Sequence, residues 1–474
     1  MTVYGLLEQA AATWPDRVAL VDDRGALTFR ELYAEAESLR ESLRAEGLGP
    51  RQGLGVLARN GRGFVVAVFA GLGCGAVVMP MFHQLRRSEL ADQLTQVALH
   101  AVLDDRALED LLPAPGVPLL RGELRFTRMN TPPERPFVPH VEDAAFVRYT
   151  SGTTGKAKGV VVSHRAVLER TAAAREALDL GPDDTVAWVL PMAYHFIVSV
   201  VMYVRYGVTI AVCPDMFADG ILDVARERGA TLLYASPLHV RMLTGEPSGR
   251  TVPTLRCVVS TSSALPRDLA LAFQARYGLP VRQVYGIIEC GLPLGDLGAE
   301  DAAPGTVGRA LPGYEIGVLD DEGRPLPAGV AGNLAIRGPG MFDGYLDPPS
   351  GVADVLRLGW FMTGDLAVVS EDGRVTISGR RKSMINVAGH KVFPEEVEAV
   401  LDAWPGVAAS RAYGVPHPTL GEVVHAEVVP DPDGAVDVEA LRRACQARLS
   451  GHKIPQQIVV VASVRMTGSG KVAR

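Results

Sequence analysis

Short apolar segments alternate with amphipathic helical patterns along most of this 474-residue chain. Apolar runs at 18–21 and 53–58 predict short buried strands. Residues 32–45, with Leu39 and Leu43 on one face, predict a helix between them. Such alternation is typical of α/β proteins in which helices cover layered, mostly parallel sheets. The chain is too long for one compact core, so we expect more than one domain.

The pattern changes toward the C-terminus. Turn signals at 321–323 and 371–373 lie between alternating apolar runs and predict β-hairpins before residue 380, a β-rich subdomain. The elements expected after residue 392 are helices at 394–402 and 436–449 and strands near 407–413 and 423–429. They predict a small α+β domain behind the large α/β domain. The proline-rich residues 111–140 show no period, so we expect an irregular connecting segment there.

Residues 64–82 form a charge-free stretch about long enough to span a bilayer. Three glycines and Pro80 interrupt it, so it predicts a buried helix near 63–72 followed by a buried strand near 76–80. Residues 71–76 formally match the G-x-G-x-x-G/A dinucleotide fingerprint. That fingerprint follows a strand and opens a helix, whereas these glycines close a helix, so we do not expect a dehydrogenase.

Charge and cysteine content argue against several classes of protein. The net charge of −7 gives no general attraction for nucleic acid or anionic lipid. The five cysteines are scattered without a C-x-x-C pair, which fits neither a disulfide framework nor a zinc site. The N-terminus lacks the basic segment and apolar segment of a secretory signal. We therefore expect a cytoplasmic protein with no nucleic-acid partner and no membrane insertion.

The strongest chemical signal is a run of glycine, hydroxyl and lysine residues at 149–159, between apolar strands at 144–147 and 160–162. Its glycines let backbone N–H groups approach a polyphosphate, its hydroxyls donate to phosphate oxygens and its lysines offset the charge. It is not a Walker A loop, because an alanine follows the Gly155-Lys156 pair where that motif has Ser or Thr. The run predicts a phosphate-binding loop, with a flexible polar turn as the alternative.

Four further motifs follow this loop along the chain. They are Tyr285-Gly-Ile-Ile-Glu289, Gly359-Trp-Phe-Met-Thr-Gly-Asp365, Gly379-Arg-Arg-Lys382 leading to residues 389–398, and Gly470-Lys471. Together with the loop, they resemble the superfamily of adenylate-forming enzymes: acyl-CoA and aryl-CoA synthetases, peptide-synthetase adenylation domains and luciferases. The resemblance spans almost the whole chain. It implies a large domain at 1–381, a hinge at Lys382 and a small mobile domain at 383–474 that rotates between an adenylating and a thioester-forming pose.

The resemblance also implies a reaction. Such an enzyme uses ATP and Mg²⁺ to activate a carboxylic acid as its acyl-adenylate, releasing pyrophosphate, and then transfers the acyl group to a thiol. Lys471 is implied to reach the carboxylate and the α-phosphate, and Glu289, with Thr150, to bind magnesium, for which hard oxygen ligands are suited. The implied nucleotide-binding residues are Thr150, Ser151, Gly152, Thr153, Thr154, Gly155, Lys156, Ser263, Ala264, Tyr285, Gly286, Asp365 and Arg380. For Ser263 and its neighbours a plain turn is the alternative.

The acid that binds is less constrained by the sequence. In the family, the segment at 191–196 commonly carries a catalytic gating histidine or another aromatic, and either Tyr194 or His195 could hold that place; a buried core histidine is the alternative for His195. The expected substrate-pocket residues are Tyr194, His195, Phe196, Ile287 and Ile288. Their apolar character favours an aryl or fatty acid. Residues 194–199 also lack the aspartate that commonly holds an α-amino group.

Ile288 departs from the family, which usually has a threonine there whose hydroxyl contacts the α-phosphate. Losing that donor could cost about 1–3 kcal/mol. A nucleotide-binding pseudoenzyme is therefore one alternative, although intact Lys471, Glu289 and Asp365 favour turnover. The other alternative is an amino-acid or β-amino-acid adenylating enzyme that loads a carrier protein. Coenzyme A and the phosphopantetheine arm of an acyl carrier protein present the same thiol, and Gly389 and Lys391 could line a channel for either.

Overall fold

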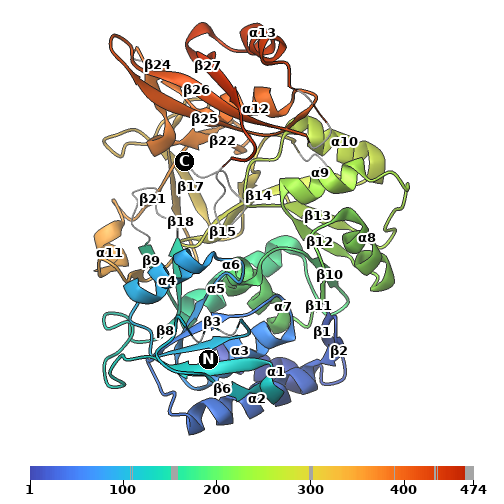
Figure 1. Ribbon diagram of the computed structural model, residues 1–474, viewed down its shortest axis with the longest axis vertical. Coiled ribbons are helices and arrows are strands. Elements are labelled where there is room, and N and C mark those ends of the chain that lie inside the picture. The colour runs from blue at the N-terminus through green and yellow to red at the C-terminus, as the bar shows by residue number, and fades with distance from the viewer. Residues whose placement is uncertain are drawn as a thin grey trace. The chain divides into compact units, whose positions relative to one another are not determined.

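The computed structural model describes residues 1–106, 108, 110–150, 158–297, 303–388, 390–431, 434 and 436–464, without the side chains of Thr150 and Lys391. Its contacts divide the chain into two compact units (Figure 1). The first comprises Met1–Tyr314 and Arg337–Leu356, and the second comprises Glu315–Ile336 and Arg357–Arg474. The boundary expected at residues 381–383 stays a prediction.

A mixed sheet in the first unit carries the β12–β14 region central to the candidate site. In spatial order its strands are β16 Arg309–Ala310, β15 Gly291–Gly295, β14 Val281–Ile287, β13 Cys257–Ser260, β12 Leu232–Ala235, β10 Thr185–Trp188, β11 Thr209–Val212, β1 Val18–Asp22 and β2 Gly25–Thr28. The strands from β14 through β1 are parallel. Parallel neighbours need crossovers, which here are α8 Ala218–Glu227, α9 Pro237–Gly245 and α10 Arg267–Tyr277. Leu222, Val240 and Phe273 of these helices belong to the core under the sheet.

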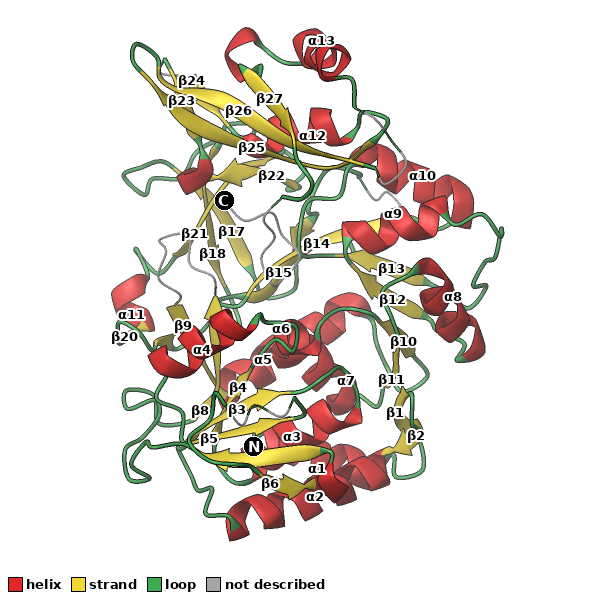
Figure 2. Ribbon diagram, in the orientation of Figure 1, coloured by secondary structure: helices red, strands yellow, loops and turns green. Residues whose placement is uncertain are grey.

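A second mixed sheet in the same unit carries the hairpin around the expected phosphate loop. In spatial order its strands are β20 Ser350–Gly351, β19 Gly344–Tyr345, β9 Lys158–Ser163, β8 Ala144–Thr150, β4 Val77–Pro80, β3 Gly53–Leu57, β5 Ala101–Asp104, β7 Leu124–Arg128 and β6 Val117–Leu119. The remaining helices of the unit are α1 Val3–Thr13, α2 Phe29–Ala45, α3 Arg62–Gly73, α4 Arg87–Gln96, α5 His164–Leu178, α6 Met192–His195, α7 Val201–Arg205 and α11 Val352–Val355. Figure 2 shows α1, α2 and α3 gathered beside β3 and β5.

Local chemistry explains where these elements begin and end. Thr28 and Glu31 form a reciprocal capping box that starts α2, because each side chain accepts the other's backbone N–H. The charge-free stretch folds as predicted into α3 and β4, both buried. Gly75 between them has a φ of 74°, which favours glycine. None of the helices in the described ranges combines the length and apolarity needed to cross a membrane.

The prediction of an irregular segment over 111–140 is wrong in part. Strands β6 and β7 lie within it, joined by the short 3-10 helix η1 Leu120–Gly122, and β7 pairs with β5 while burying Leu124 and Phe126. Pro118 is accommodated in β6, which is the edge strand of the sheet, where no ladder hydrogen bond is needed on the outer side. The surrounding prolines obscured the two-residue alternation of apolar and polar side chains that predicts a strand.

In its described residues, the second unit has two antiparallel-rich sheets and two α-helices. One sheet has the order β17 Glu315–Leu319, β18 Gly332–Arg337, β21 Phe361–Val369 and β22 Val375–Arg380. The other has the order β24 His390–Val392, β23 Ile385–Val387, β26 Gly421–Pro430 and β25 Val407–His417, with β27 Gln457–Val460 also on β26. Helices α12 Pro394–Asp402 and α13 Val438–Arg448 pack against it, and the 3-10 helices are η3 Arg381–Ser383 and η4 Gly451–Lys453. The predicted α/β class with a β-rich part and a small α+β part is confirmed.

Candidate active site

The carboxyl ends of β13 and β14 carry several predicted nucleotide-binding residues. Ser263 and Ala264 follow β13 and are exposed, while Tyr285 and Gly286 lie near the end of β14. Because β13 and β14 are neighbouring parallel strands, their carboxyl ends meet at one edge of the sheet, where ligands bind in open α/β sheets. A Cβ at Gly286 would lie 2.9 Å from the Gly291 carbonyl oxygen, so the backbone approach there requires glycine.

The loop that carries Glu289 is held at three points. The three consecutive carbonyl groups of residues 288–290 each accept a hydrogen bond from a different part of the first unit. The donors are Nη1 of Arg170 (3.0 Å), the backbone N–H of Phe342 (2.8 Å) and the hydroxyl of Tyr314 (2.9 Å). A side chain on a loop fixed in this way is preorganised, because little conformational entropy remains to be lost on binding.

Arg170 is a positioning residue that the sequence interpretation missed. It lies fully buried on α5, where Nε also donates to the carbonyl of Gly340 at 2.9 Å. Burial lowers the pKa of Arg170 below its ordinary value. The sequence holds one signal: Val167, Arg170, Thr171 and Ala174 share the spacing of one helix face, and an arginine on such a face needs buried acceptors.

The Glu289 carboxylate is tied to the strand that follows the expected phosphate loop. The Tyr345 hydroxyl donates to Oε1 of Glu289 at 3.2 Å, and Nζ of Lys158 lies 4.6 Å from the centroid of the Tyr345 ring. Burial, followed by the charge of Glu289, raises the pKa of Tyr345 above its ordinary value, so its hydroxyl stays a donor. The pairing of β19 with β9 thus brings two distant motifs together at Glu289.

The single carboxylate of Glu289 fits a magnesium ion carried by a nucleotide. Mg²⁺ is usually bound by one or two protein carboxylates, and phosphates and water supply its remaining ligands. Within the described part of the chain, no group of three or more His, Cys, Asp or Glu could hold a metal ion by itself.

Several predicted site residues cannot be placed. Ser151, Gly152, Thr153, Thr154, Gly155, Lys156, Gly389 and Lys471 lie outside the described residues, as do the side chains of Thr150 and Lys391. The backbone of Thr150 is described, and it pairs with Lys158 across the β8–β9 hairpin. The expected phosphate loop therefore connects two hydrogen-bonded strand ends.

Removing the Tyr345 hydroxyl tests the importance of its hydrogen bond to Glu289. We expect Tyr345→Phe to lower kcat/KM for magnesium–ATP about 10-fold, since a hydrogen bond to a charged group is lost. Steady-state kinetics at varied ATP and Mg²⁺ measure this. Tyr277→Phe is the matched control, because the Tyr277 hydroxyl donates to a backbone carbonyl, that of Leu243, at 2.8 Å. Equal kinetics for the two variants would contradict a role for Tyr345.

Tyr194 and His195, at the end of α6, face different surroundings. The Tyr194 ring lies 4.9 Å from the Phe82 ring and 4.1 Å from Cζ of Arg148. The His195 ring meets Trp188 and Tyr234 edge-on, with centroids 5.8 and 6.0 Å apart. The two side chains expected to compete for one gating position therefore contact different groups.

Phe196 anchors the same segment in the core. It is fully buried, and its ring lies 5.7 Å from Phe64 and Phe69 and 6.2 Å from Phe146. It also begins η2 Phe196–Val200, a π-helix turn. Such turns interrupt the regular helix repeat and are frequent at functional sites. Ile287 and Ile288, the other expected pocket residues, remain partly exposed at the end of β14 and in the turn after it.

The second unit brings together the predicted ribose-binding pair. Asp365 and Arg380 are direct partners in the β21–β22 ladder, and Nε of Arg380 lies 2.8 Å from Oδ1 of Asp365. The backbone N–H of Asp365 donates to the Thr363 hydroxyl at 3.1 Å. Asp365 is buried whereas Arg380 is partly exposed, so the arginine can change partner more easily than the aspartate. Lys382, the predicted hinge, lies exposed in η3 just after this ladder.

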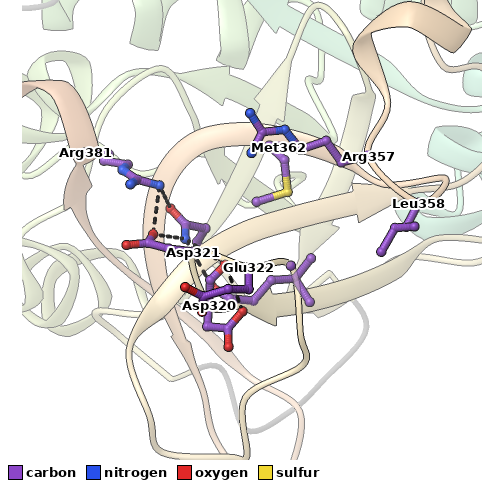
Figure 3. Close-up of a pocket in the computed structure, with 10 residues that line it drawn as sticks. Asp320, Asp321, Glu322, Arg357, Leu358, Met362 and Arg381 are labelled. Atoms are coloured by element: carbon purple, nitrogen blue, oxygen red, sulfur yellow. Dashed lines mark hydrogen bonds and ion pairs between the residues drawn. The ribbon is translucent and has the colours of Figure 1, made fainter.

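A cavity of about 340 Å³ lies beside the 319–323 turn of the second unit (Figure 3). Several of its charged groups have partners: Arg381 pairs with Asp321 at 3.0 Å and donates to Asn333, and Asp320 pairs with Arg324. No predicted site residue lines it. Its ion pair at Arg381 holds the residue before the predicted hinge against the 319–323 turn.

Two family models, several curated proteins and several solved structures match most of this chain. The family described as AMP-binding enzyme matches residues 7–346, and AMP-binding enzyme C-terminal domain matches 396–471. Sulfoacetate–CoA ligase from Cupriavidus necator is 31% identical, over 100% of this chain and 96% of that protein. Feruloyl-CoA synthase from an Amycolatopsis species is 28% identical, over 98% of each. ATP-bound MatB from Rhodopseudomonas palustris superposes with a TM-score of 0.87 at 27% identity, covering 100% of this chain and 97% of that one.

Proposed function

This chain belongs to the AMP-binding enzyme family, and we propose that it is an acid–thiol ligase that converts a carboxylic acid to its acyl-adenylate and then to a thioester. The observation that carries the proposal is the meeting of Glu289, Tyr345 and Lys158, which joins the glutamate motif to the end of the phosphate-loop hairpin. A carboxylate and a lysine around one nucleotide site suit magnesium-bound polyphosphate. ATP binding in a structural neighbour supports the same assignment.

In this proposal the chain supplies positioning and charge, and no enzyme nucleophile is needed. The substrate carboxylate attacks the α-phosphate of ATP, and pyrophosphate leaves with the electron pair of the broken P–O bond. Bound Mg²⁺, held by Glu289 and by Thr150, would neutralise charge on the phosphates. Tyr285 and the Ser263–Ala264 loop would border adenine, and Asp365 and Arg380 would bind the ribose side.

The acceptor in this proposal is the thiol of coenzyme A. Two relatives, sulfoacetate–CoA ligase and feruloyl-CoA synthase, carry coenzyme A in their names, which supports that choice over a carrier protein. The phosphopantetheine arm of a carrier protein presents the same thiol and stays the alternative. All five cysteines are buried and unpaired, which fits a reducing compartment, and we place the reaction in the cytoplasm.

Acid-dependent release of pyrophosphate from ATP and Mg²⁺ tests the proposed function. The panel comprises aryl, fatty, β-amino and α-amino acids, with mass spectrometry of adenylates and coenzyme A thioesters. We expect release, an adenylate and a thioester with at least one acid. Bound ATP without pyrophosphate release across the panel would contradict the ligase and favour the pseudoenzyme. Transfer of the acyl group from the adenylate to a carrier protein, but not to coenzyme A, would show that a carrier protein is the acceptor.

The replacement Ile288→Thr tests the departure from the family motif. The Ile288 carbonyl accepts a hydrogen bond from Arg170, and this contact does not involve the side chain that is replaced. We expect adenylation to stay equal or rise up to about 10-fold, because a hydroxyl donor is added near the reacting phosphate. Stopped-flow pyrophosphate release measures the change, and Ile288→Val is the control without a hydroxyl. A large loss of adenylate formation would show that the isoleucine shapes the site.

A further inference from the structure

Arg148 is a partly exposed arginine in the first unit whose surroundings differ from those of the buried arginines Arg62 and Arg170. It lies on β8, directly before the glycine, hydroxyl and lysine run at 149–159. Side chains alternate along a strand: Val147 and Tyr149 enter the core cluster on one face, while Phe146 contacts Phe196 on the other. Arg148 therefore shares the face of Phe146, which is turned toward the 194–200 segment.

The contacts of Arg148 leave most of its donors unused. Its Cζ lies 4.1 Å from the Tyr194 ring centroid, a cation–π contact, and Nη1 donates to the carbonyl of the adjacent Tyr149. In the part of the chain that the structure describes, no carboxylate pairs with it. Glu89 acts electrostatically on Tyr194, but its carboxylate accepts the backbone N–H of Arg86 and caps α4.

Two buried arginines of the first unit show how their donors can be satisfied. Arg62 forms an ion pair with Asp22 at 2.6 Å, and Arg170 donates to the carbonyls of Ile288 and Gly340. Burial lowers the pKa of Arg148 to about 10, which still leaves it charged at neutral pH. Arg148 has a single carbonyl acceptor and is partly exposed beside Tyr194, so most of its charged donors remain open to the oxygen atoms of a ligand.

We propose that the guanidinium of Arg148 binds a second anionic group, a carboxylate or a sulfonate, on the acid that this enzyme activates. This inference rests on the proposed function and narrows its substrate class. Arg148 retains some exposure, so a ligand can reach it. Planar guanidinium groups bind carboxylate and sulfonate oxygens through paired hydrogen bonds, and Tyr194 and Phe82 supply an aromatic wall for the body of the acid.

Matched acids test the proposal. Propanoate, malonate and sulfoacetate differ in one terminal group, which is methyl, carboxylate or sulfonate; 4-methylbenzoate and terephthalate form an aromatic pair. We expect the wild type to favour the anionic members in kcat/KM for pyrophosphate release. In Arg148→Met, the kcat/KM of each anionic acid relative to that of its methyl-terminated partner should fall about 10- to 100-fold, the range expected for a hydrogen bond to a charged group. The Arg148→Lys variant should recover part of this ratio.

The matched control is Arg175→Met, because Cζ of Arg175 also lies over a tyrosine ring, at 5.7 Å from Tyr206. It should leave the ratio unchanged. Thermal melts check that the variants fold. Calorimetry then measures the binding of malonate, sulfoacetate and terephthalate to the wild type and to Arg148→Lys, and this measurement requires neither turnover nor the Arg148→Met variant. Weaker binding in Arg148→Lys supports the proposal, and unchanged binding overturns it.

The outcomes separate this proposal from the proposed function. Pyrophosphate release with only the methyl-terminated acids, propanoate and 4-methylbenzoate, would overturn the proposal for Arg148 but would still support the ligase function. Equal loss for all acids with a raised KM for ATP would also overturn it, because Arg148 would then serve the nucleotide. If no acid releases pyrophosphate but diacid binding still depends on Arg148, the ligase fails and the anion site stands.

Discussion

Replacing Lys471 with alanine is expected to slow acyl-adenylate formation by two to three orders of magnitude, roughly the effect of removing one group that stabilises transition-state charge. The Gly470-Lys471 motif implies that this lysine approaches both the carboxylate and the α-phosphate, where negative charge accumulates. Thioester formation from a supplied acyl-adenylate should stay near the wild-type rate, because that step needs no charge stabilisation at the α-phosphate. Rapid-quench assays of each half-reaction measure the two rates separately.

Arg411→Ala is the matched control for this prediction. Arg411 also belongs to the C-terminal region, and its Nη1 pairs with Glu427 at 3.3 Å between β25 and β26, outside the motifs of the reaction. Both half-reactions should proceed normally in that variant. If Lys471→Ala slowed both half-reactions equally, the lysine would not be specific to adenylation, and its proposed role would be wrong.

Replacing Glu289 with glutamine should slow adenylation about 100-fold, because an uncharged amide is a weaker ligand for Mg²⁺ while the shape is kept. The Mg²⁺ concentration for half-maximal rate should rise in parallel. The loop itself should stay in place, since its three carbonyl groups are bound by Arg170, Phe342 and Tyr314. Pyrophosphate release across a magnesium titration measures both effects.

The control for the glutamate is Glu37→Gln, which removes a carboxylate paired with Arg40 on α2. It should leave the magnesium titration unchanged. ATP binding without Mg²⁺ should be equal in Glu289→Gln and the wild type, because the carboxylate acts through the cation. A variant with a normal magnesium requirement and a normal rate would exclude Glu289 as the metal-binding residue.

Local patterns in the sequence predicted several of the elements correctly. The helix predicted at 394–402 forms over Pro394–Asp402, and the charge-free stretch at 64–82 became a buried helix and a buried strand. Periodicity works here because the 3.6-residue and two-residue repeats are set by backbone geometry. It failed at β6 and β7, where the pairing of β7 with β5 and of β6 with β7, rather than a local preference, decided the structure.

The sequence by itself determined which chemical groups are present: the hydroxyl- and glycine-rich loop follows from residue type and spacing, and the family resemblance singles out Glu289, Asp365 and Arg380. Only the tertiary structure decided what surrounds them. Tyr345 at Glu289, Arg170 at the Ile288 carbonyl and Arg148 over the Tyr194 ring depend on contacts between segments far apart in the chain. The physical reason is that burial and partners, which set the strength of a charge, arise from packing and leave no local period in the sequence.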